Sequence, residues 1–77
     1  MNNLEKSRSL FKESFQYTGD VEGLAYQAIP EWDSVGHMQL MAGLEDCFGI
    51  ELDVDDIIDF SSFKKGIIIL SKYNVVI

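Results

Sequence analysis

Hydrophobic residues recur at helical spacing near the start of the chain. Leu4, Phe11 and Phe15 fall on one side when successive residues are turned by about 100°, and Tyr17 widens that stripe. The charged residues of the same segment lie off the stripe, as is typical of an amphipathic helix with one solvated face. The pattern predicts a helix over residues 3–17.

This periodicity stops between residues 18 and 33. Gly19, Asp20 and Gly23 favour turns, and Pro30 lacks an N–H and disfavours helix at the residue before it. We therefore expect a long loop after the first helix. A loop of this length in a small domain is usually functional or held down by its own apolar side chains. Those side chains are Leu24, Tyr26, Ile29 and Trp32.

The remaining sequence predicts three more helices. Asp33 and Ser34 are favoured N-cap residues and Gly49 is a favoured stop, which indicates a helix over residues 34–48. Apolar residues then recur at three- and four-residue spacing, which favours a short helix over residues 54–60.

A last helix is expected over residues 62–73, capped by Ser61 or Ser62. The β-branched run at residues 67–70 would also suit a strand, but the chain offers no second convincing strand to pair with it. With 77 residues, the chain is too short to divide into two cores. Residues 1–77 are therefore expected to form a single all-α domain, a small four-helix bundle of three longer helices and one short helix, with a long loop after the first.

Charge narrows the classes of partner. Acidic residues outnumber basic ones by 13 to 6, and the net charge of −7 repels nucleic acid and anionic lipid. Basic protein surfaces are the natural complement. Residues 1–6 do not form a basic segment followed by an apolar run, and no stretch approaches membrane-spanning length. We expect a cytoplasmic monomer that binds neither nucleic acid nor membranes.

Several candidate chemistries are weak. Cys47 is the single cysteine, so it has no internal disulfide partner and is expected to be an ordinary buried thiol. Asp33, Ser34 and His37 invite comparison with a hydrolytic triad, but a triad also needs an oxyanion hole and a pocket. The aspartates within residues 53–59 lack the glycine and the glutamate of a calcium loop. We expect no catalysis and no metal site.

The most informative segment is Trp32-Asp33-Ser34-Val35-Gly36-His37-Met38, followed by Leu44-Glu45 and Phe48-Gly49-Ile50. Here the sequence resembles the acyl carrier protein family. That family carries an Asp-Ser dipeptide followed by an apolar residue, and the serine hydroxyl is modified with the phosphopantetheine group of coenzyme A. The resemblance implies that Ser34 is the attachment site and that Asp33 and Val35 are the flanking residues.

The resemblance implies a non-catalytic carrier that holds acyl intermediates as thioesters on a 4′-phosphopantetheine arm, as in fatty acid or polyketide biosynthesis. Its partners would be a phosphopantetheinyl transferase and acyl-activating or acyl-transferring enzymes with basic docking surfaces. A peptidyl or D-alanyl carrier of the same fold stays open, as does a small acidic helical adaptor with no prosthetic group. One departure from the family is that Gly36 and Gln39 stand where fatty-acid carriers are often acidic.

The physics of the second helix agrees with this interpretation. A phosphodiester on Ser34 would lie where the helix dipole is positive and the first N–H groups lack partners. Helical spacing separates a core face from a second apolar strip on the Ser34 side. The core face comprises Leu40, Met41, Leu44 and Phe48, of which Leu40, Leu44 and Phe48 are expected to shelter cargo together with Ile57. The expected partner surface comprises Val35, Met38 and Ala42, flanked by Glu45 and Asp46.

Overall fold

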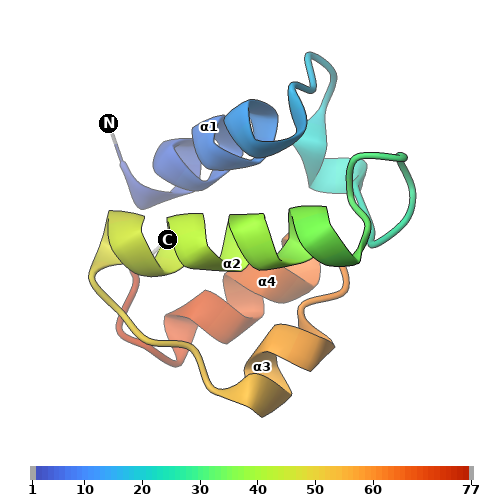
Figure 1. Ribbon diagram of the computed structural model, residues 1–77. Coiled ribbons are helices and arrows are strands. Elements are labelled where there is room, and N and C mark those ends of the chain that lie inside the picture. Colours follow the sequence, from blue (N-terminus) through green and yellow to red (C-terminus); the bar gives the residue numbers. More distant parts are fainter. Residues whose placement is uncertain (1, 77) are drawn as a thin grey trace.

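The computed structural model describes residues 2–76, which form a bundle of four α-helices. The helices are α1 (Asn3–Phe15), α2 (Ser34–Phe48), α3 (Val54–Asp59) and α4 (Phe63–Ser71), and a 3-10 turn, η1 (Val21–Gly23), lies in the loop after α1. Figure 1 shows α1 antiparallel to α2, with α4 behind α2 and α3 at the lower edge. The expected all-α bundle with three longer helices and one short helix is confirmed.

Local capping sets the bounds of α2, and both of its ends were predicted correctly. The side chain of Asp33 accepts a hydrogen bond from the N–H of Gly36, which starts the helix. Gly49 ends it in a left-handed conformation, with φ of 64°. These are contacts between near neighbours in the chain, so the sequence carries their signal directly.

The first helix is shorter than the predicted range 3–17. Gln16 takes a left-handed conformation with φ of 50°, although it is not a glycine. The N–H of Tyr17 then bonds to the carbonyl of Lys12 at 3.0 Å, closing the last turn. The chain leaves the helix at Phe15 for this reason.

The last two helices also fall inside the predicted ranges 54–60 and 62–73. Phe60 has ψ of 76°, outside helical values, so α3 ends one residue early. Ser62 lies outside α4 as its N-cap, where its hydroxyl accepts from a first-turn N–H at 3.0 Å. At the C-terminal end of α4, the N–H of Tyr73 bonds to the carbonyl of Leu70, three residues back instead of the four of an α-helix. The α-helix therefore ends before the predicted residue 73.

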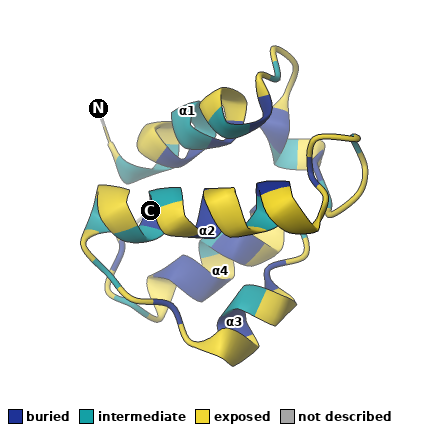
Figure 2. Ribbon diagram, in the orientation of Figure 1, coloured by how far each residue is buried: buried dark blue, intermediate teal, exposed yellow. Residues whose placement is uncertain are grey.

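An aromatic cluster forms the centre of the core. Phe11 of α1 packs its ring against Trp32, Phe60 and Phe63, with ring centroids 5.5, 6.1 and 4.9 Å away. Figure 2 shows the buried residues on the inward faces of the helices, while the outer face of α2 is exposed. The aliphatic residues that complete the core include Leu40, Met41, Leu44, Ile69 and Leu70.

The loop between α1 and α2 is held against the bundle, as expected. Leu24 and Trp32 are buried and Ile29 is half-buried, but Tyr26 remains 37% exposed. The loop backbone is also anchored, because the N–H of Tyr26 bonds to the carbonyl of Ser61 at 2.8 Å. An isolated bridge between Ala25 and Ser62 joins the same two segments.

The two ends of the described chain lie together. The side-chain amide of Asn3 donates to the carbonyl of Val76 at 2.9 Å. In Figure 1 both ends lie toward the C-terminal end of α2, away from Ser34 at its N-terminal end. Within residues 2–76, none of the helices has the length and apolar character needed to cross a membrane.

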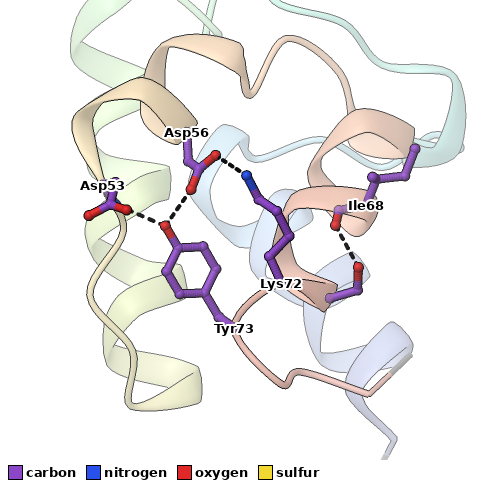
Figure 3. Close-up of polar contacts among 6 residues, drawn as sticks. Asp53, Asp56, Ile68, Lys72 and Tyr73 are labelled. Carbon is purple, nitrogen blue, oxygen red and sulfur yellow. Dashed lines mark hydrogen bonds and ion pairs between the residues drawn. The ribbon is translucent and has the colours of Figure 1, made fainter.

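A polar clasp, made by Asp56, Lys72 and Tyr73, ties the short helix α3 to the end of α4 (Figure 3). The Asp56 carboxylate accepts hydrogen bonds from the ammonium of Lys72 and from the hydroxyl of Tyr73. The Tyr73 hydroxyl in turn accepts from the main-chain N–H of Asp53 at 3.0 Å, which holds the start of α3. The hydrogen bond from Lys72, followed by that from Tyr73, lowers the pKa of Asp56.

Replacing Asp56 by Asn should remove part of the acid sensitivity of folding. The pKa of Asp56 is lowered from its ordinary value of 3.8, so the clasp contributes stability that is fully present above that value. This stability is lost as the pH falls through the lower, folded-state pKa. Urea titrations below about pH 4 should therefore show a smaller further loss of stability for Asp56→Asn than for the wild type.

The matched control is Asp55→Asn, an exposed carboxylate on the same helix. It should retain the wild-type loss of stability in acid. If Asp55→Asn and Asp56→Asn lost the same stability as the pH falls, the role given to the Asp56 carboxylate in acid sensitivity would be contradicted.

Candidate functional site

Asp33 and Ser34 have different roles at the start of α2: Asp33 caps the helix, and Ser34 is exposed on its first turn. Asp33 is the N-cap of α2, and its carboxylate accepts from the N–H of Gly36 at 2.8 Å. Ser34 is the first residue of the helix and is exposed. Its hydroxyl lies 3.2 Å from the hydroxyl of Tyr26. Because Asp33 performs the capping, the Ser34 hydroxyl is presented to solvent at the positive end of the helix.

A close backbone approach positions this end of α2. Gly36 is buried, and a Cβ atom placed on it would lie only 2.0 Å from the carbonyl oxygen of Glu31. The loop therefore passes too near the first turn for any other residue at this position. An acidic side chain therefore has no room at position 36.

Trp32 and His37 connect the loop to the helices around Ser34. The indole N–H of Trp32 donates to Nδ1 of His37 at 2.9 Å, so that nitrogen carries no proton. The proton is on Nε2, which donates to the carbonyl of Ile57 in α3 at 2.7 Å. The planes of the two rings are nearly parallel, with an interplanar angle of 16°.

The residues of the rejected hydrolytic triad have other partners in the structure. Both ring nitrogens of His37 are engaged, by Trp32 and by Ile57. The Asp33 carboxylate is turned to the helix N–H groups. The Ser34 hydroxyl pairs with the hydroxyl of Tyr26.

A pocket of about 360 Å³ opens beside the Ser34 hydroxyl. Its walls come from the loop, α2 and α3, and are mostly apolar. The lining residues are Tyr26, Ser34, His37, Met38, Ile57, Ile58, Phe60 and Ser61. Only Ile57 belongs to the set expected to shelter cargo: Leu40 and Leu44 are fully buried in the packed core. The pocket thus lies at the edge of the bundle, between α2 and α3.

Most residues of the expected partner surface are exposed. Val35 and Met38 are 67% and 53% exposed, and Ala42 is also exposed, so an apolar strip does run from Ser34 along α2. Asp46 is an exposed carboxylate beside it. Glu45 also has a partner within the chain, because its carboxylate accepts from the main-chain N–H of residue 52 at 2.8 Å and holds the link between α2 and α3. Its place in a docking surface stays a prediction.

The structure adds apolar surface that sequence reasoning missed. Ile58 and Val54 of α3 are 71% and 70% exposed, and Ile58 also lines the pocket. Asp53 and Asp55 on either side of Val54, and Asp59 directly after Ile58, were a usable signal for an exposed face. Cys47 is exposed, so the expectation of a buried thiol was wrong. Across residues 2–76, no three acidic, histidine or cysteine side chains are grouped as a metal ion requires.

Replacing Gly36 by Ala should destabilise the chain although alanine is the better helix former. The added methyl group meets the Glu31 carbonyl oxygen, so the loop or the helix start must shift, at a cost of about 1–3 kcal/mol. Chemical denaturation measures the loss. Gly23→Ala is the control, because an added Cβ there meets nothing within 4 Å and should change stability by less than about 0.5 kcal/mol. Equal stability of the two variants would contradict the close approach.

Comparisons with known proteins do not assign this chain to a family. No family model matches it, and neither the curated proteins nor the solved structures contain a significant match. The functional interpretation therefore depends on the geometry around Ser34 and on the resemblance of its sequence motif.

Proposed function

We propose that this chain is a carrier protein whose Ser34 hydroxyl takes a 4′-phosphopantetheine arm from coenzyme A. The observation that carries the proposal is the placement of Ser34: exposed, first in α2, and at the edge of an apolar pocket. The Asp33-Ser34-Val35 motif supports the same residue independently. An attached arm would carry its cargo as a thioester, which activates the acyl carbon for partner enzymes.

The residues around Ser34 fit such a group. The Asp33 carboxylate is occupied by the N–H of Gly36, and the first N–H groups of α2 point out of the helix end, where an anionic phosphodiester is stabilised. The exposed hydroxyl leaves a large transferase room to approach. The apolar pocket offers a place for the arm or the first part of its cargo to lie.

Loading forms a bond from the Ser34 oxygen to the phosphorus that carries pantetheine in coenzyme A. The phosphoanhydride bond to adenosine 3′,5′-bisphosphate breaks, and the serine proton passes to a base. Because His37 and Asp33 are engaged elsewhere, that base belongs to the transferase. This chain is therefore the acceptor in the reaction and contributes position and recognition.

The surface next to Ser34 suits transient docking. The apolar strip of Val35, Met38 and Ala42 continues to the exposed Ile58 across the pocket. Exposed acids border it, and a basic partner would be drawn to them at an increased rate of encounter. We propose acyl-activating or acyl-transferring enzymes as these partners.

Two alternatives share parts of this evidence. A peptidyl or D-alanyl carrier would use the same serine and the same pocket, with a different cargo. The exposed apolar strip by itself also suits an acidic adaptor that binds a basic protein without any arm. The adaptor differs from the carriers in having no need of the Ser34 hydroxyl.

Incubation with coenzyme A and a broad-specificity phosphopantetheinyl transferase should add one phosphopantetheine mass to the wild-type chain. Intact mass spectrometry measures the gain, and Ser34→Ala should show none. Ser61→Ala is the matched control, because Ser61 is exposed and lines the same pocket, and it should load like the wild type. A folded wild-type chain that never gains the mass would sink the carrier proposal and favour the adaptor.

Replacing Met38 by Glu should weaken productive docking more than folding. The charge falls in the apolar strip, and we expect kcat/KM for loading to drop about tenfold, which is about 1.4 kcal/mol. Met38 is half exposed, so the urea midpoint should hardly change. Gln39→Glu adds the same charge at the next exposed position and should load nearly normally. If kcat/KM for loading fell equally in both variants, the added negative charge alone would explain the loss, and the apolar strip would have no role in docking.

A further inference from the structure

Tyr26 lies on a part of the loop whose backbone cannot drift. Its N–H bonds to the carbonyl of Ser61 at 2.8 Å, and the next residue, Gln27, bonds to the carbonyl of Trp32 at 3.0 Å. Gln27 has φ of 65°, a left-handed conformation that turns the chain sharply at this point. The backbone at Tyr26 is therefore held both to Ser61, which lines the pocket, and to Trp32, two residues before Ser34.

The ring of Tyr26 is fixed as well. It meets the ring of His37 edge-on at 5.4 Å and that of Trp32 at 6.4 Å, with interplanar angles of 77° and 87°. Trp32 and His37 are themselves joined by a hydrogen bond. These contacts direct the phenol hydroxyl to the Ser34 oxygen, 3.2 Å away, where both residues line the pocket.

A phenol hydroxyl can both donate and accept, so it suits the Ser34 side chain before and after modification. In the unmodified chain one of the two hydroxyl groups donates to the other. Once Ser34 is esterified, its oxygen has no proton and the neighbouring phosphate oxygens are anionic acceptors. Tyr26 is then the donor, and its hydrogen bond becomes charge-assisted.

We propose that Tyr26 is a positioning residue for Ser34. Its hydroxyl holds the serine side chain in one rotamer before loading and donates to the phosphodiester afterwards, which orients the root of the arm toward the pocket. The second half of this proposal rests on the proposed function, whereas the first half concerns the unmodified chain alone. Val35 and Met38 form the docking strip, so Tyr26 should affect the orientation of the hydroxyl and not the binding of the transferase.

The test is Tyr26→Phe, which keeps the ring contacts and removes only the hydroxyl. In the unmodified chain, Hα–Hβ couplings of Ser34 should report one rotamer for the wild type and an average of rotamers for the variant. In loading assays, kcat should fall about fivefold while KM stays the same. In the loaded chain, the phosphorus-31 resonance of the phosphodiester should shift relative to the wild type.

Tyr17→Phe is the control, since Tyr17 follows α1 and its hydroxyl lies beside Gly19 instead of Ser34. It should leave the couplings, kcat and the phosphorus resonance unchanged. If the wild type loads and Tyr26→Phe matches it in all three measurements, the positioning role is overturned and the carrier proposal stands. If the wild type does not load, the carrier proposal and the phosphodiester contact fall together, while averaged Ser34 couplings in the wild type overturn the rotamer role.

Discussion

The complete burial of Trp32 is the constraint on which the rest of this structure depends. Its indole N–H must find an acceptor inside the protein, because an unpaired buried donor costs about 1–3 kcal/mol. Nδ1 of His37 supplies that acceptor, which orients the imidazole and leaves Nε2 to donate to Ile57 in α3. One aromatic side chain thus joins the loop, α2 and α3. Ser34 follows two residues after it and takes its place from this arrangement.

The walls of the pocket beside Ser34 differ in how firmly they are held. The α2 side is part of the packed core, and the loop side is tied down by Trp32 and by backbone hydrogen bonds. The opposite wall is α3, a helix of six residues, too short to be stable alone. Its attachments include the Ile57 carbonyl bond and the clasp at Asp56. Of the pocket walls, α3 is therefore the one that depends most on contacts with the rest of the chain.

Sequence reasoning succeeded where the deciding contacts are local. Asp33 and Gly49 set both ends of α2 through hydrogen bonds to residues three or four positions away, and such short-range signals can be read directly from the sequence. It missed contacts between residues that are distant in the chain and unusual backbone conformations: the bond from the N–H of Leu52 to the Glu45 carboxylate joins residues seven positions apart. No residue type announces the left-handed Gln16 that ends α1. The contact between Tyr26 and Ser34 is also invisible in sequence, because it requires the loop to fold back over α2.

The pairing of Asn3 with Val76 has a practical and architectural consequence. Both ends of the described chain emerge near the far end of α2, about 22 Å of helix from Ser34. A bead, a surface or a neighbouring folded unit joined at either end would lie on the side of the domain opposite Ser34. Ser34 would still face open solution, so the domain can be immobilised or joined into a longer polypeptide without covering this residue.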